Sequence, residues 1–269
     1  MSAAIRFRSA SIRGVIACLL VALAGAQLRP APAVAAGLPA DSSRYQYVVH
    51  WSTLPDKDLL QGSAYTAWSR RAIPRAIMVA GVTGLATYRA AAGGPHIINV
   101  FSFPSFAALA AWRNAPDIEA LHEQSREFTY ELASEIWGPS PTLPDPIVAE
   151  GRAVTDSSHV FYVVAWNEYP RKIDAYRRWI VEASKRWARG PEILAVRGYR
   201  ELAGAHADVF TFEFPSLEAW ARWYGDAGMQ KTRAESRELV IDTRTELWGP
   251  NPMLPVPMSA QAMRERLRH

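Results

Sequence analysis

The chain has 269 residues, 49% of them hydrophobic, and a formal net charge of +4. Residues 1–35 contain four arginines and no acidic residue, so the rest of the chain carries 26 basic and 26 acidic residues. A neutral chain without a long Lys/Arg cluster excludes nucleic acid as an expected partner. The one cysteine, Cys18, also lies in residues 1–35, so we expect no disulfide, thiolate metal site or cysteine nucleophile after them.

Residues 1–35 have the pattern of a secretory signal peptide. A basic start is followed by an apolar run of about 13 residues, Gly14 to Ala26, which is shorter than the roughly 20 needed to span a bilayer. Small-residue cleavage signals lie at Ala24-Gly25-Ala26 and Ala33-Val34-Ala35. We therefore expect a periplasmic or secreted protein with no membrane span after cleavage.

The remaining sequence contains one pattern twice. Tyr47-Val48-Val49-His50-Trp51 returns 115 residues later as Tyr162-Val163-Val164-Ala165-Trp166. Trp137-Gly138-Pro139 returns 111 residues later as Trp248-Gly249-Pro250, so a single four-residue length difference relates the two copies. The pattern predicts half 1 over 44–138, a Pro-rich linker over 139–158, half 2 over 159–250 and a Pro-containing tail over 251–269. We expect each Trp-Gly-Pro segment to lie across the other half.

The predicted elements follow the same order in both halves. In half 1 they are a strand over 45–52, a helix within 56–78 that Pro74 should kink or shorten, and paired strands over 82–91 and 97–103. In half 2 a helix over 171–189 precedes strands over 193–201 and 209–214, a helix that starts at Pro215-Ser216, and a closing strand over 239–248. This order is β-α-β-β-α-β, the split βαβ of ferredoxin-like α+β units.

The four strands of such a unit form a sheet with both helices on one face, so its other face needs a cover. Two sheets packed face to face provide that cover, and the space between them can hold a small ligand. We therefore predict two tandem ferredoxin-like units packed sheet to sheet as one fused barrel.

This arrangement resembles the dimeric α/β-barrel superfamily, whose nearest members are the antibiotic-biosynthesis and heme-degrading monooxygenases and NIPSNAP-like proteins. The resemblance covers both halves through element order and aromatic placement. In half 1, Trp112 precedes His122 by ten residues. In heme-degrading members this spacing supplies a porphyrin-packing Trp and an axial His, together with an Asn at the end of the first strand. This sequence has Ser52 and Asn167 at the first-strand positions and Arg233 where His122 would align, so neither half holds the complete set.

Two histidines are candidates for ligation or catalysis. The resemblance implies that His122 could bind heme, whereas its place beside Glu119 and Glu123 is typical of a helix-surface histidine. Strand alternation places His50 on the face opposite Trp51, toward the second sheet. There His50 can act as a base or ligand, or it can be a structural histidine bonded to backbone. With Asn167 these residues are the catalytic candidates; we predict no protein-only metal site.

Aromatic and arginine side chains are the candidates for ligand binding. Four tryptophans can wall an apolar pocket for a flat ligand, or they can simply fill the core: Trp51, Trp112, Trp166 and Trp223. Arg126 and Arg237 recur before the closing strand, where each can hold a carboxylate or form a surface ion pair.

These patterns predict an exported protein that binds a small apolar or aromatic molecule between its sheets, and that can assemble into oligomers. A monooxygenase-like activity centred on half 1 is the enzymatic version. The alternatives are a heme-binding protein that uses His122, and a non-catalytic structural or assembly protein whose own side chains fill the core.

Overall fold

The computed structural model describes residues 44–54, 57, 63–92, 97–148, 159–251 and 258–259. The chain divides after Ala40, and every element below belongs to the second unit, residues 41–269. The predicted signal peptide, the later part of the predicted linker (149–158) and most of the predicted tail lie outside the described residues. Within the described ranges, no helix is both long enough and apolar enough to cross a membrane.

Both halves have the predicted order, except that the second helical region is two helices. The elements of half 1 are β1 (Tyr45–Thr53), α2 (Ala64–Met78), β2 (Gly84–Ala92), β3 (Ile97–Phe103), α3 (Phe106–Arg113), α4 (Pro116–Ser125) and β4 (Thr129–Pro139). Those of half 2 are β6 (Val160–Glu168), a short 3₁₀ turn (Pro170–Lys172), α5 (Ile173–Ala188), β7 (Ala195–Ala203), β8 (Asp208–Phe214), α6 (Leu217–Gly225), α7 (Ala227–Ser236) and β9 (Val240–Pro250). The short strands β5 (Ile147–Val148) and β10 (Met258–Ser259) pair with β7 and β2.

Capping residues explain where the second helical region begins and why it is divided. The Ser105 and Ser216 hydroxyls accept the first backbone hydrogen bonds of α3 and α6. Asp226 ends α6 and caps α7 by accepting from two backbone amides. In half 1 the division falls at Pro116, which suits a first helical position because its missing N–H needs no partner there.

Pro74 does not end α2, which continues through it to Met78. Proline removes the hydrogen bond to the carbonyl four residues earlier, which belongs to Arg70. Because Arg70 is exposed, water can satisfy that carbonyl. The described part of the helix begins at Ala64, with Ser63 as its cap.

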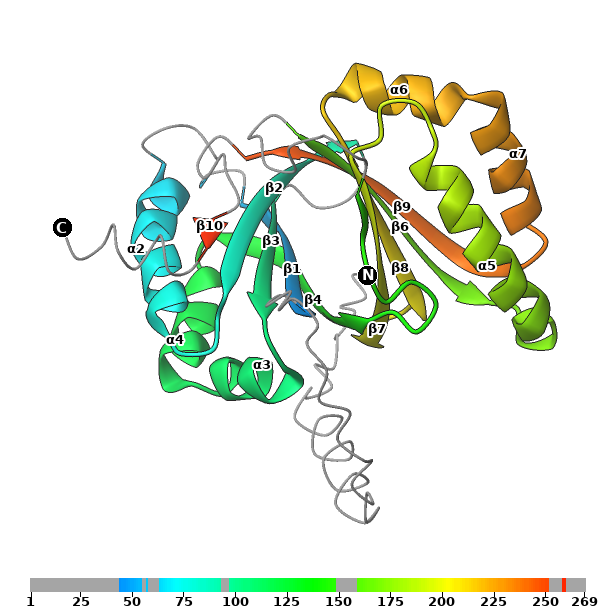
Figure 1. Ribbon diagram of the computed structural model, residues 1–269. Helices are drawn as coiled ribbons and strands as arrows, with labels where there is room; N and C mark the ends of the chain where they lie inside the picture. Colours follow the sequence, from blue (N-terminus) through cyan, green and yellow to red (C-terminus); the bar gives the residue numbers. More distant parts are fainter. Residues whose placement is uncertain are drawn as a thin grey trace, which may run out of the picture. The chain divides into compact units, whose positions relative to one another are not determined.

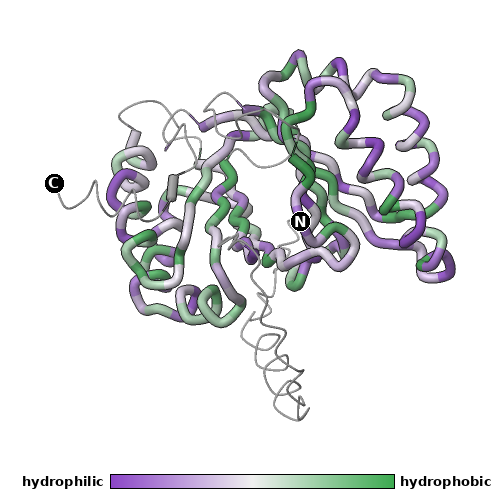
Figure 2. Tube along the Cα trace, in the orientation of Figure 1, coloured by the Kyte–Doolittle hydropathy of each residue, from purple (hydrophilic) through white to green (hydrophobic). Residues whose placement is uncertain are grey.

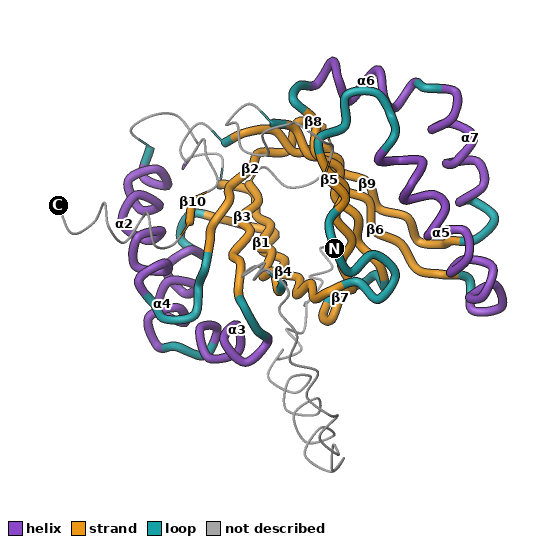
Figure 3. The backbone as a smooth tube through the Cα atoms, in the orientation of Figure 1, coloured by secondary structure: helices purple, strands orange, loops and turns teal. Residues whose placement is uncertain are grey.

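The strands form one antiparallel sheet that closes on itself (Figures 1 and 3). Its order is β2-β3-β1-β4-β7-β8-β6-β9, and a further pairing of β9 with β2 completes the ring. The two joints between halves are made by the Trp-Gly-Pro segments: Gly138 pairs with Arg200, and Gly249 pairs with Arg89. Each segment therefore crosses to the other half as expected, and the molecule is a fused α/β barrel.

Three hydrophobic cores result from this closure. In each half the helices cover the outer face of their own strands, α2 to α4 in half 1 and α5 to α7 in half 2 (Figure 1). The third core lies inside the barrel around Val48, Ile98, Trp137, Val209 and Trp248. Hydrophobic residues are concentrated in the strands, whereas the helices alternate between hydrophobic and hydrophilic residues (Figure 2). The sheet is thus covered on both faces, and each face offers space for a site.

Candidate functional site

The four tryptophans that the sequence offered as pocket walls or core residues lie on the helix-covered face of the barrel wall. Trp51 and Trp112 belong to the core between strands and helices in half 1, and Trp166 and Trp223 belong to its equivalent in half 2. Trp51 and Trp166 lie on strands, where neighbouring residues point to opposite faces, whereas Trp112 and Trp223 lie on the helices that cover the outer face. The geometry that turns His50 into the barrel turns Trp51 toward the helices.

Two of these indoles are fixed in equivalent ways. Trp112 donates a hydrogen bond from Nε1 to the Ala76 carbonyl at 2.8 Å, and Trp223 donates to the Trp187 carbonyl at 3.3 Å. Each bond ties the second helical region to the end of the first long helix of its half. Both side chains are buried, with 1% and 2% exposure. They therefore form rigid walls.

A small cavity in half 1 lies beside Trp51, Trp112 and His122. Its volume is about 50 Å³, which is room for one or two water molecules. Apolar side chains from α2 and α4 fill most of the space between helices and sheet. The side chains of half 1 therefore fill nearly all of its own core, as the structural-protein alternative predicts for the whole molecule.

His122 is the titratable group of that small cavity. Burial, together with the positive charges of Arg113 and Arg126, lowers the pKa of His122 to about 4. The imidazole is therefore neutral at pH 7. Its ring lies 6.3 Å from the ring of Tyr47.

The corresponding space in half 2 is much larger, at about 330 Å³. It lies between the β9 strand and helices α5 to α7, and its long aromatic wall consists of Tyr162, Trp166, Trp179, Trp187, Phe212 and Trp223. Burial raises the pKa of Tyr162 to about 12, so its phenol keeps its proton at neutral pH. An aromatic cavity of this size is typical of small-molecule sites.

Two arginines lie at the polar side of the half-2 cavity. The Arg233 guanidinium lies 3.9 Å from the ring centroid of Tyr224, in a cation–π contact. Arg237 also borders the cavity and is exposed. Its counterpart Arg126 instead pairs with Glu123 at 3.0 Å on the surface of α4 and borders no cavity described here. Of the two predicted arginines, the structure therefore brings only Arg237 to a cavity.

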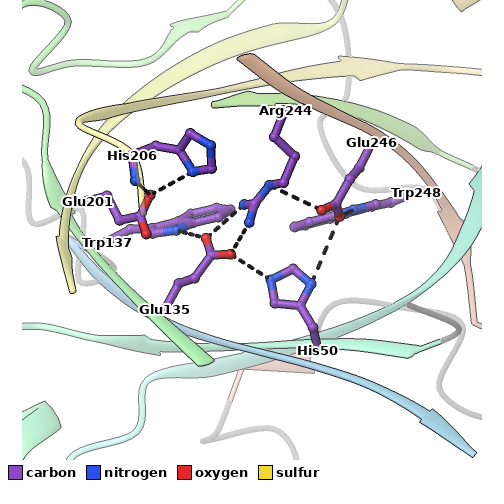
Figure 4. Close-up of polar contacts among 8 residues, drawn as sticks. All are labelled: His50, Glu135, Trp137, Glu201, His206, Arg244, Glu246 and Trp248. Atoms are coloured by element: carbon purple, nitrogen blue, oxygen red, sulfur yellow. Dashed lines mark hydrogen bonds and ion pairs between the residues drawn. The ribbon is translucent and has the colours of Figure 1, made fainter. Parts of the chain in front are cut away.

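The barrel interior contains a buried charged cluster that joins the halves (Figure 4). The Glu135 carboxylate of half 1 accepts two hydrogen bonds from the Arg244 guanidinium of half 2, the Nη2–Oε2 distance being 2.9 Å. Arg244 Nε also lies 3.2 Å from Glu246. His50 lies between the two carboxylates, 3.4 Å from Glu135 and 3.9 Å from Glu246.

The same cluster includes one indole from each half. Trp137 Nε1 donates to Glu135 at 2.8 Å, and Trp248 Nε1 donates to Glu246 at 2.7 Å. The two indole planes stack within 14° of parallel, with their centroids 6.2 Å apart. In each half, a Glu and the Trp two residues after it on the same strand are therefore joined by a hydrogen bond.

Electrostatics keep the bridging carboxylate charged. Burial by itself would raise the pKa of Glu135, but the adjacent His50 and Arg244 outweigh it and hold the pKa well below its usual range. Burial by itself would lower the pKa of Arg244, but the hydrogen bond to Glu135 and its negative charge outweigh burial, so the pKa of the guanidinium is raised. The pair is a structural ion pair in which every charge has a partner.

His50 lies on the inner face of the barrel. It faces two carboxylates and the edge of Trp248, 6.0 Å between ring centroids. Its counterpart in half 2 is Ala165, and Arg244 has Ala133 as its counterpart in half 1. Each half thus supplies one large basic side chain where the other half has alanine.

Comparison with known proteins identifies the architecture. No known family model and no curated protein matches the sequence. An anthrone oxidase-like protein of solved structure is 11% identical, with a TM-score of 0.60 over 82% of this chain and 94% of that one. A candidate monooxygenase from Fusobacterium nucleatum subsp. nucleatum is 9% identical, with a TM-score of 0.58 over 78% of this chain and 93% of that one. A variant chlorite dismutase from Candidatus Nitrospira defluvii is 11% identical, with a TM-score of 0.54 over 84% of this chain and 95% of that one.

This chain has the dimeric α/β-barrel fold. A single chain of each solved structure spans both of its halves, which agrees with the fold expected from the sequence. At these sequence identities the similarity establishes the fold but not the reaction, because one fold hosts many chemistries.

The heme that some dimeric α/β-barrel proteins bind does not fit the residues present. His122 has a free-base imidazole, but the cavity beside it is about 50 Å³, far smaller than a porphyrin. The half-2 cavity is larger, but Arg233 occupies the position equivalent to His122 and has no lone pair to offer a metal. The described ranges also contain no group of three His, Cys, Asp or Glu that could hold a metal ion.

Asn167, the first-strand candidate, lies at an irregularity between β6 and β9. Its side-chain amide donates to the Ala205 carbonyl at 3.2 Å and lies 3.5 Å from the Asp242 carboxylate. Asp242 has a φ of 52°, in the left-handed region, and borders the half-2 cavity. Asn167 is therefore linked to the cavity through Asp242, whereas Ser52 is buried in half 1.

Sequence reasoning missed several residues that the structure brings together. Glu135, Glu246 and Arg244 are not among the site residues predicted from the sequence. The available signal was the repeated Glu-x-Trp, since two residues with one between them share a strand face. Sequence spacing does not show that Arg244 of half 2 contacts Glu135 of half 1.

Proposed function

We propose that this protein is an exported small-molecule-binding protein that takes an apolar or aromatic ligand into its half-2 cavity. The observation that supports this most is the roughly 330 Å³ space walled by four tryptophans, within the size range of small-molecule sites. Burying aromatic surface there gains about 25 cal/mol per Å² removed from water. The ligand position differs from the one expected from the sequence, which was between the sheets.

The two arginines at the rim favour a ligand with an acidic substituent. Arg233 is fixed against Tyr224, and Arg237 has an exposed guanidinium beside the same opening. A guanidinium binds a carboxylate through paired hydrogen bonds, more strongly than it binds a neutral group. We therefore expect a flat aromatic acid to bind better than the corresponding alcohol.

The test uses 2-naphthoate and 2-naphthalenemethanol with the purified protein, followed by quenching of tryptophan fluorescence. Thr232 lies in the cavity wall and is 1% exposed, and its half-1 counterpart is Leu121. Thr232→Leu fills space and is expected to weaken both ligands at least tenfold. Arg233→Gln is expected to weaken 2-naphthoate and to leave the alcohol nearly unchanged.

The matched control is His122→Gln, the same position in half 1, which should leave both affinities unaltered because that cavity is too small for the probes. Saturable binding that Thr232→Leu does not weaken would place the ligand elsewhere and refute the assignment. No binding of any aromatic probe would favour the structural or assembly alternative.

A monooxygenase-like activity is the second candidate, and Asp242 is the observation that favours it. Its carboxylate borders the half-2 cavity from a backbone conformation that non-glycine residues seldom adopt, which is common at functional sites. A carboxylate there can accept a proton from an acidic C–H of a bound ligand. Anthrone is a suitable probe, since one O₂ converts it to anthraquinone and water. Formation of anthraquinone that Asp242→Asn abolishes would support the activity; a rate equal to that without protein would refute it.

Export belongs to the same proposal and has its own test. The basic start and apolar run of residues 1–35 support it. Expression of the full chain in a Gram-negative host should yield periplasmic protein that begins at Gln27 or Ala36. Protein retained in the cytoplasm at full mass would contradict it.

A further inference from the structure

A third cavity lies inside the barrel, on the opposite side of the wall from the half-2 cavity. Its volume is about 250 Å³, and it takes in Gln46 at the start of β1 and Phe161 at the start of β6. The charged cluster of Figure 4 begins four residues further along β1, at His50. The interior cavity is therefore distinct from the proposed ligand site, and it meets the charged cluster at the indoles of Trp137 and Trp248.

The cavity exists because the two halves differ where they face each other. Half 2 contributes Arg197 from β7 and Glu213 from β8, whereas the equivalent residues of half 1 are Ala86 and Ser102. The small side chains of half 1 leave space in front of the charged pair. Two copies of either half would not produce this combination.

The charged pair presents hydrogen-bond donors to this space. Glu213 is 2% exposed and both its oxygens are engaged, one by Arg197 Nη1 at 2.8 Å and the other by His159 Nδ1 at 2.7 Å. A guanidinium has five N–H donors, and the bond to Glu213 uses one of them. Arg197 therefore remains able to donate to a molecule in the cavity.

The remaining walls are aromatic. The stacked indoles of Trp137 and Trp248 border the cavity, each with a tyrosine against it: Tyr199 lies 5.3 Å from Trp137, and Tyr88 lies 5.4 Å from Trp248. Burial raises the pKa of Tyr88 well above its usual range, so its phenol is neutral. Flat rings fit between such walls through offset or edge contacts.

We propose that the barrel interior is a second binding site, which takes a small uncharged planar aromatic molecule whose carbonyl oxygen accepts from Arg197. The ligand is uncharged because Glu213 already balances Arg197, and a further buried anion would lack a counter-charge. The carbonyl oxygen of the ligand can accept a hydrogen bond from the Arg197 N–H groups that are not bonded to Glu213. The aromatic ring occupies the space that Ala86 and Ser102 leave open.

The experiment compares benzamide with benzoate, which has the same shape and a negative charge, and with ethylbenzene, which has no acceptor. Binding is followed by NMR through the indole N–H resonances of Trp137 and Trp248. We expect saturable shifts with benzamide, and affinities at least tenfold weaker for the other two. Benzoate binding as tightly as benzamide would overturn the proposal.

Variants locate the site. Ala86→Phe fills the cavity from half 1 and should abolish the benzamide shifts; Ser102→Leu does so from the neighbouring strand if the first variant fails to fold. Arg197→Gln should weaken benzamide about tenfold while ethylbenzene is unaffected. Thr232→Leu, in the half-2 cavity, should leave benzamide binding unchanged. Benzamide shifts that survive in both filled variants, or no shift in the unaltered protein, would refute the interior site.

Discussion

Glu135 and Arg244 lie 109 residues apart in the sequence and form a bidentate ion pair inside the barrel (Figure 4). The pair connects β4 of half 1 with β9 of half 2, at positions where the opposite half has Glu246 and Ala133. It therefore depends on half 1 facing half 2. A barrel made of two identical halves would have either two such arginines or none.

Removing the arginine should destabilise the fold strongly. Arg244→Ala leaves the Glu135 carboxylate buried with His50 as its nearest basic group, and breaking one side of a buried pair costs about 3–5 kcal/mol. Urea denaturation measures the change in the free energy of unfolding. As a control, Arg75→Ala removes an exposed pair with Asp117 and should cost about 1 kcal/mol or less. Equal losses in the two variants would contradict the structural role of the buried pair.

The stability of the barrel should fall in acid because of the same carboxylate. The pKa of Glu135 is lower in the folded state than in the unfolded chain, whose ordinary value is about 4.3. The contribution of Glu135 to the free energy of unfolding is therefore complete above about pH 5. It is lost as pH falls below that value, because the unfolded chain then binds a proton that the folded protein does not. Denaturation midpoints between pH 7 and 3 should drop more steeply for the unaltered protein than for Glu135→Gln. Parallel curves would show that Glu135 is not the group responsible.

His122 should titrate near pH 4, well below an ordinary histidine. Between about pH 6.5 and 4 the unfolded chain binds a proton that the folded protein does not, so this group makes stability rise with pH across that window. An NMR titration of the imidazole resonances gives the pKa directly. His122→Gln should remove this part of the pH dependence while leaving the loss of stability due to Glu135 at lower pH. A measured pKa near 6.5 would mean that the side chain is solvated.

Gly190 should tolerate no side chain. A Cβ built there would lie 2.3 Å from Cδ1 of the buried Trp223, whose Nε1 is held by its hydrogen bond to the Trp187 carbonyl. Gly190→Ala should cost about 1–3 kcal/mol through displacement of that indole. A Cβ on Gly225 meets nothing within 4 Å, so Gly225→Ala is the control and should be neutral or slightly stabilising. Urea midpoints and near-ultraviolet circular dichroism report stability and the indole environment; a neutral Gly190→Ala would contradict the packing at Trp223.

The sequence was most informative where local chemistry decides the outcome. Period-two alternation placed the strands close to their observed bounds and indicated that His50 and Trp51 face opposite sides. Pro215-Ser216 marked the start of α6, although the division of the second helical region, at Pro116 in half 1 and Asp226 in half 2, was not predicted. Pro74 lies inside α2, which continues to Met78.

The sequence by itself determined the order of elements, the pairing of two similar halves and the barrel they form, since these follow from hydrophobic period and from faces that must be covered. Only the tertiary structure decided which aromatic residues surround a space, which half retains room for a ligand, and which carboxylate meets Arg244. Cavity volume is the small remainder left by dozens of packed side chains, and a long-range ion pair depends on strand register across the joint between halves. Neither quantity is encoded in local spacing.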